Sequence, residues 1–424
     1  MTGIVPWLAL LYVALLPVGR SGLPMNAQWG DLLLPPLAFA VAMTRQGEGR
    51  RWWRPGDGPL ALYLLATLVT AVISEEPSKG FEHLAKQLSV ALVFVVFRIL
   101  APDIVLGRRL QIGFVAATAA VTATSIAVVF PGYPGAVPPS MFGESQVLPL
   151  FGLVRRLRGL FEAPEMLGNT LLFAFSLALG LRACAAGRSR GWWTALAAFL
   201  ALGEFFTYSH SVAGFAVAAA LFVGPGLRSG PLKALAGLGA LVIVLVVNAA
   251  SVMDPRPPAR GTHYEVGAVS FEFLGTKLEG RLMSYGALKQ VAWSAFLEQP
   301  LAGVGPGRFT VETERAFSEG RLTKRYRSVP PHCDLTGRLA ETGLFGAASL
   351  LVLWAAWLRG MRPGLFTGPP MQRAAMAGVM GLLVNSLNAD VMNFRFLWLA
   401  LAWASWPGAR SDRAAAPIAQ PRLL

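Results

Sequence analysis

Long apolar stretches alternate with short polar connections along almost the whole chain. Stretches of about twenty residues recur, and a helix of that length crosses roughly 30 Å of hydrocarbon with some tilt. They begin near Ile4, Gly30, Gly58, Leu84, Leu110, Met166, Gly191, Ser211, Gly230, Gly337, Met371 and Phe394. The pattern predicts an all-α, polytopic integral membrane protein with about twelve transmembrane helices, in a single integral membrane domain over residues 1–424.

The composition agrees with that pattern. The chain of 424 residues is 54% hydrophobic and only 14% charged, which a soluble protein of this size could not solvate. Its formal net charge of +14 would suggest nucleic-acid binding in a soluble domain. Here short basic connections on one membrane face account for most of the excess. We therefore expect contacts with membrane lipids and no nucleic-acid partner.

Arginine and lysine collect in alternate connections, and this sets the orientation. The basic connections lie at residues 45–54, 108–109, 182–190, 228–233 and 359–373, and the C-terminal tail adds arginines at 410–422. The positive-inside rule assigns this side, and with it both termini, to the cytoplasm. The acidic connection Ser74–Pro77 then falls on the outer side, as expected.

The longest connection, residues 253–331 between spans nine and ten, falls on the outer side. It opens with a turn-rich segment at 254–258 and then becomes helical. From Arg281 to Gln299, apolar residues recur at three- and four-residue spacing, which predicts an amphipathic helix headed by Arg281. The helix stops at Pro300, and three glycines then predict a tight turn; they are Gly303, Gly305 and Gly307.

Two clusters of cations lie on this outer side, where topology does not explain them. One holds Arg155, Arg156 and Arg158, and the other is centred on Arg281. Interfacial anchoring could explain the first cluster, and a surface ion pair with a neighbouring glutamate could explain the second. An anionic ligand is the alternative that we favour, because the planar guanidinium binds phosphate through paired hydrogen bonds, each worth roughly 1.5–3 kcal/mol.

His332 follows Pro330-Pro331, where a membrane helix resumes at the outer surface. It could be a structural histidine, but nearby arginines would keep its ring neutral, as a general base requires. Asp334, Arg338 and Glu341 follow at three- and four-residue spacing and predict an ion-pair ladder on the first helical turns. The sequence has no HExxH motif or cysteine cluster, so we expect neither a metal site nor a cofactor.

Three groups of residues, in a fixed order, resemble a known family. They are Arg156, Gly159, Phe161 and Pro164; then Arg281 with Pro300, Gly303 and Gly305; then His332 with Glu341, Gly343 and Gly346. The set resembles the O-antigen ligase family, whose superfamily also contains O-antigen polymerases and pilin oligosaccharyltransferases. The resemblance covers about Arg156 to Gly346 and agrees with the topology outside that range.

The resemblance implies a GT-C-like, multi-pass protein of the bacterial inner membrane with a periplasmic active site. It implies metal-independent, inverting transfer of O-antigen polysaccharide from undecaprenyl diphosphate to the outer core sugar of lipid A-core, which completes lipopolysaccharide. Arg156 and Arg281 would hold the diphosphate, and His332 would activate the acceptor hydroxyl. Proximity adds Arg158 to the diphosphate site, and Asp334 and Glu341 are candidate supporting residues.

Two other functions fit part of the pattern. An O-antigen polymerase would use a second lipid-linked repeat as acceptor, and the sequence does not separate it from a ligase. A flippase or exporter for lipid-linked glycans would carry charges inside its spans along a crossing path. The middles of the predicted spans are almost free of charge and the cations collect at one face, so we favour the enzyme.

Overall fold

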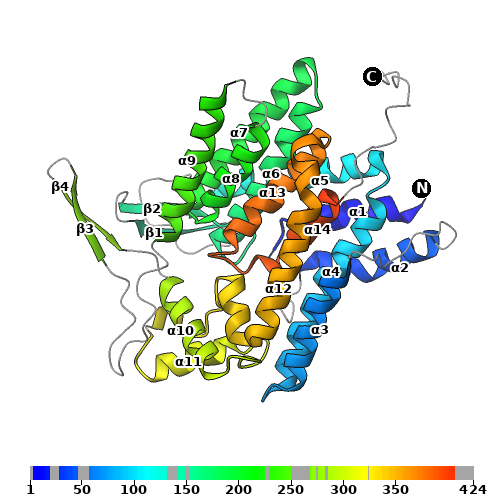
Figure 1. Ribbon diagram of the computed structural model, residues 1–424. Helices are drawn as coiled ribbons and strands as arrows, with labels where there is room; N and C mark the ends of the chain where they lie inside the picture. The colour runs from blue at the N-terminus through cyan, green and yellow to red at the C-terminus, as the bar shows by residue number, and fades with distance from the viewer. Residues whose placement is uncertain are drawn as a thin grey trace.

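The computed structural model describes residues 3–19, 28–45, 57–130, 142–148, 152–224, 229–249, 268–273, 276–281, 285–322 and 324–405. Helices dominate, as expected, and each of the predicted apolar stretches overlaps a helix (Figure 1). The turn at 254–258 and the arginines of the C-terminal tail lie outside the described residues.

The first half of the chain contains the following elements: α1 (Ile4–Leu15), η2 (Trp29–Leu32), α2 (Leu34–Arg45), α3 (Gly58–Val72), α4 (Pro77–Leu100), α5 (Ile104–Val129), β1 (Gly143–Leu148), β2 (Gly152–Leu157), α6 (Pro164–Ala183), α7 (Gly187–Thr207) and α8 (Ser211–Val223). The second half contains α9 (Gly230–Ala249), β3 (Ala268–Phe273), β4 (Thr276–Arg281), α10 (Tyr285–Glu298), α11 (Phe309–Ser318), η5 (Lys324–Tyr326), α12 (Asp334–Thr367), α13 (Pro370–Asn385), η6 (Val391–Asn393) and α14 (Arg395–Ala404).

Among the described residues, four helices are long and apolar enough to cross a membrane, namely α4, α5, α6 and α12. Several others are apolar but shorter than the twenty residues that we expected. The ten residues of α14, for example, span about 15 Å, roughly half the thickness of the hydrocarbon core. The apolar stretches were therefore located correctly, but their helices are less uniform in length than their hydropathy suggested.

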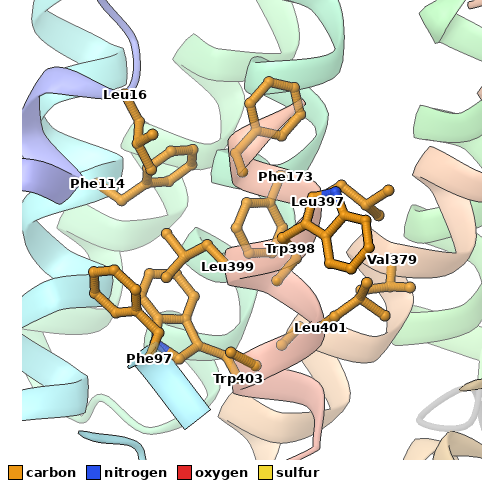
Figure 2. Close-up of a cluster of buried hydrophobic side chains, with 14 of the residues drawn as sticks. Leu16, Phe97, Phe114, Phe173, Val379, Leu397, Trp398, Leu399, Leu401 and Trp403 are labelled. Atoms are coloured by element: carbon orange, nitrogen blue, oxygen red, sulfur yellow. The ribbon is translucent and has the colours of Figure 1, made fainter. Parts of the chain in front are cut away.

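Helix α14 forms the centre of the bundle. It is apolar on every side, and all its residues from Phe396 to Ala404 are buried, as expected for a helix enclosed by others. Figure 2 shows Trp398 and Trp403 among side chains from other helices, including Phe97 of α4 and Phe173 of α6. The indole N–H of Trp398 donates to the carbonyl of Met392 at 2.8 Å, so burying this ring leaves no unpaired donor.

Two antiparallel hairpins interrupt the helical pattern, and neither was predicted. β1 pairs with β2 and places Glu144 opposite Arg156. β3 pairs with β4 and places Ala268 opposite Arg281. The second hairpin corrects our expectation for Arg281: this residue ends a strand, and the following helix begins at Tyr285. The alternation of Val269, Phe271 and Phe273 with polar neighbours has the two-residue period of a strand.

The outer connection packs against α12 at one end of the bundle, where α10 and α11 lie in Figure 1. Helix α12 breaks at Gly343, where φ is 60° and ψ is −160°. The loop after α10 supplies hydrogen bonds at this break. The Leu344 N–H donates to the carbonyl of Pro300 at 2.8 Å, and the Val304 N–H donates to that of Ala340 at 2.9 Å. The start of α12 is therefore held against the outer segment.

Candidate functional site

Side chains from four separate parts of the chain meet at one end of the bundle. Arg156 of β2 lies 3.2 Å from Glu165 in the first turn of α6 (Nη2 to Oε1). The Tyr285 hydroxyl, at the start of α10, donates to the same Glu165 oxygen at 3.1 Å. The Tyr285 ring stacks on His332, with centroids 4.4 Å apart and planes inclined by 14°. The contacts therefore link the predicted base to one of the predicted arginine clusters.

Arg156 is already engaged with protein groups. Besides Glu165, its Nη1 contacts Glu144 Oε1 at 3.3 Å, and its Nε donates to the carbonyl of Thr207 at 2.9 Å. The residue is only 7% exposed. Two carboxylates thus oppose one guanidinium, so an anion could bind to Arg156 only in competition with a glutamate.

The other arginines of the two predicted clusters differ in position. Arg155 donates from Nη1 to the carbonyl of Val129 at 2.6 Å and so ties the hairpin to the end of α5. Arg158 is half-buried and donates to the carbonyl of Glu162 at 3.4 Å. Arg281 closes β4, but its side chain lies outside the described part of the chain. The proposed pairing of Arg156 with Arg281 stays a prediction.

His332 adopts a left-handed backbone conformation, with φ at 47°. This is uncommon for a residue other than glycine and turns the chain from Pro331 into α12. The His332 imidazole has no hydrogen bond to any described residue, and it is positioned by stacking on the Tyr285 ring. Burial lowers the His332 pKa, while the negative charges of Glu165 and Asp390 act in the opposite direction. Burial, rather than the arginines that we expected, is therefore what favours the neutral ring.

Asp334 lies away from the ladder that we predicted for α12. Its carboxylate accepts from the backbone N–H groups of Val391 and Met392, at 3.1 and 3.2 Å. Its own N–H donates to the carbonyl of Ser386 at 3.0 Å. Asp334 therefore fixes the start of α12, directly after His332, to the connection between α13 and α14.

Arg338 and Glu341 form the second half of the predicted ladder, at 3.4 Å, but both are buried. Arg338 also contacts His83 Nε2 of α4 at 2.6 Å. Glu341 accepts from the backbone N–H of Phe309, at 3.4 Å. These two side chains join α12 to α4 and to the start of α11, so their contacts hold in place the helix that follows His332.

Sequence reasoning missed two groups close to His332. His210, between α7 and α8, contacts the Tyr285 ring edge to face, with centroids 5.1 Å apart. Lys289, one turn after Tyr285 on α10, donates to Asn388 Oδ1 at 3.1 Å. It is half-buried and has no carboxylate partner among the described residues, and burial lowers its pKa. The sequence pattern does not single out His210 or Lys289, because only the fold brings them together.

Comparison with known proteins adds no assignment, because the sequence matches no family model and no curated protein.

Proposed function

We propose that this protein is a membrane glycosyltransferase that moves a glycan from undecaprenyl diphosphate to a sugar hydroxyl of lipid A-core, as an O-antigen ligase does. One observation carries the proposal. The His332 imidazole, which has no hydrogen bond to any described residue, stacks on the Tyr285 ring, and the Tyr285 hydroxyl donates to the Glu165 carboxylate that pairs with Arg156. A base and a cation side by side are what an inverting displacement of a diphosphate requires.

The proposed reaction assigns each group one task. The neutral His332 ring accepts the proton of the acceptor hydroxyl while that oxygen attacks the anomeric carbon. The bond from the anomeric carbon to the diphosphate oxygen breaks, and its electron pair leaves with the diphosphate. The anomeric configuration inverts, and the proton on His332 passes to solvent. General-base assistance of this kind contributes roughly 10²–10⁴-fold to the rate.

The charges around the site indicate how the leaving diphosphate would be stabilised. Lys289 carries a positive charge that no carboxylate among the described residues offsets. Arg156 can contribute once one of its carboxylates is displaced. Glu144 is the better candidate for displacement, because it is 30% exposed and its contact is 3.3 Å, whereas Glu165 is 13% exposed and also holds Tyr285. Arg158 and Arg281 are further proposed donors.

The test is a reconstituted transfer assay without divalent metal. Purified protein in lipid vesicles is mixed with undecaprenyl-diphosphate-linked glycan and lipid A-core, and glycan-bearing lipid A is resolved on a gel. We expect product with the wild type and with Cys184→Ala, a change at an exposed cysteine outside the site. We expect none with His332→Ala, provided that the variant is inserted and folded.

The other outcomes are also decisive. Near-normal turnover by His332→Ala would remove the base assignment and leave the activity. Longer lipid-linked glycans without modified lipid A would make the protein a polymerase. If wild-type protein produces neither product, the glycosyltransferase proposal is wrong.

A further inference from the structure

His210 is a second histidine at the site, and its ring is enclosed without a hydrogen-bonding partner. It occupies the turn that joins α7 to α8, where Tyr208 adopts a left-handed conformation with φ at 45°. Both ring nitrogens are buried, and neither has a hydrogen bond to any described residue. Buried polar atoms are almost always paired, so two unpaired nitrogens on one ring need an explanation.

The surroundings of His210 connect it to the proposed reaction centre. Its ring contacts Tyr285, which also stacks on His332. Burial lowers the His210 pKa to about 4; Glu165 opposes this, while Arg156 and Lys289 add to it. The imidazole is therefore neutral at physiological pH, with one N–H donor and one nitrogen acceptor.

We propose that His210 forms a hydrogen bond with a hydroxyl group of the sugar at the reaction centre. One ring nitrogen can accept a hydrogen bond from that hydroxyl, or the N–H of the other can donate one to its oxygen. This inference rests on the proposed glycosyl transfer. A hydroxyl is both donor and acceptor and so suits either ring nitrogen, whereas a phosphate oxygen offers only an acceptor. Tyr285 contacts both imidazoles, so a sugar that displaces its ring gains access to His210 and His332 together.

The substitution His210→Phe separates binding from packing. Phenylalanine keeps a flat ring against Tyr285 and removes both nitrogens. If His210 only packs, losing its two unpaired polar atoms should stabilise the protein or leave its stability unchanged. The midpoint of thermal unfolding should therefore rise or stay unchanged. A ring that binds substrate should also lose function. We expect the Michaelis constant for one substrate to rise by about tenfold or more, because a site built for a hydroxyl discriminates strongly.

His83→Phe is the matched control for stability. It makes the same chemical change at a buried histidine whose Nε2 has a partner, Arg338 at 2.6 Å. Its unfolding midpoint should fall, whereas that of His210→Phe should not. Varying lipid-linked glycan and lipid A-core separately shows which sugar His210 contacts, since only one Michaelis constant should rise.

The outcomes keep the two proposals distinct. If the wild type transfers glycan and His210→Phe does so with unchanged constants, His210 is a packing residue and the inference is wrong. If the wild type transfers nothing, the proposed function is wrong, and binding of undecaprenyl-diphosphate-linked glycan and of lipid A-core to the purified protein in detergent then decides on His210. Weaker binding of either one by His210→Phe would support a sugar contact, and equal or absent binding of both would overturn it.

Discussion

At the scale of residues, the cations that the sequence presents as available to an anion are not the ones that lack carboxylate partners in the fold. Arg156 stood out because it lies in a run of cations on the side that the basic loops predict to be outer. The fold gives it two carboxylate neighbours, Glu144 and Glu165. Lys289 did not stand out, yet among the described residues it has no carboxylate partner. The charge available to an anion is thus set by neighbours from other elements, which a linear pattern does not show.

Replacing Lys289 should weaken donor binding. Lys289→Met removes a half-buried ammonium group, and a hydrogen bond to a charged group is worth roughly 1.5–3 kcal/mol, so the Michaelis constant for lipid-linked glycan should rise about tenfold or more. The control is Lys86→Met, a lysine on α4 that is paired with Glu82 at 2.8 Å. Initial rates at varied donor concentration measure both. Equal constants for the two variants would count against a role for Lys289.

Protonation of the two site histidines should destabilise the protein in acid. Burial lowers the pKa of His332 and lowers that of His210 from 6.5 to about 4. The unfolded chain therefore binds these protons first as the pH falls through 6.5, so the free energy of unfolding decreases until the folded pKa is reached. For His210 the loss is at most about 3 kcal/mol.

Thermal unfolding at pH 7.5 and pH 5 measures this loss. The unfolding midpoint of the wild type should be lower at pH 5 than at pH 7.5. His210→Phe lacks one of the groups that protonate, so its midpoint should fall less. A variant as sensitive to acid as the wild type would show that the fold does not lower the His210 pKa.

At the scale of elements, the break in α12 at Gly343 lets the loop after α10 approach the helix that follows His332. Gly343 has backbone angles that essentially only glycine adopts. A Cβ at this position would lie 2.4 Å from the backbone carbon and oxygen of Leu301. The loop after α10 therefore approaches α12 closely only because this residue lacks a side chain.

Gly343→Ala should consequently destabilise the outer end of the molecule. The unfavourable backbone angles alone cost about 1–3 kcal/mol, and the overlap with Leu301 adds to that. Gly360→Ala on the same helix is the control, because nothing lies within 4 Å of its Cβ. That change should be neutral or stabilising by roughly 0.5–1 kcal/mol. Unfolding midpoints in detergent compare the two, and equal midpoints would contradict the close approach.

The helices were easier to predict than the strands, for a physical reason. An apolar segment inside a membrane must pair its own backbone N–H and C=O groups, and a helix does so within one segment. The apolar stretches that begin near Gly58 and Gly230 therefore predicted the helices α3 and α9. The hairpin that ends at Arg281 is short and lies in a polar connection, where helical and strand periods overlap. The three- and four-residue spacing of apolar residues extends from the helix back to Arg281, so the prediction that this residue heads the helix was wrong.

At the scale of the whole molecule, the predicted alternation of the connections accounts for which residues can meet. Arg156, His210 and His332 lie in three connections that alternation of the basic loops placed on one side, and they share the neighbours Glu165 and Tyr285. At the ends predicted to face the cytoplasm, Arg98 of α4 pairs with Asp57 before α3. Sequence thus predicted that these three connections lie on the same side of the bundle, whereas their contacts depend on packing between helices.

This arrangement predicts which thiols a membrane-impermeant reagent reaches. Cys184 is exposed at the end of α6, on the predicted cytoplasmic side, and Cys333 is buried. In intact cells with a permeable outer membrane, the wild type should not be labelled, whereas inverted inner-membrane vesicles should be labelled at Cys184. Ser318→Cys, at an exposed position that ends α11, should be labelled in the intact cells, because the outer segment and the proposed site share one compartment. Labelling of Cys184 from outside would reverse the orientation and place the site in the cytoplasm, where a periplasmic ligase could not act.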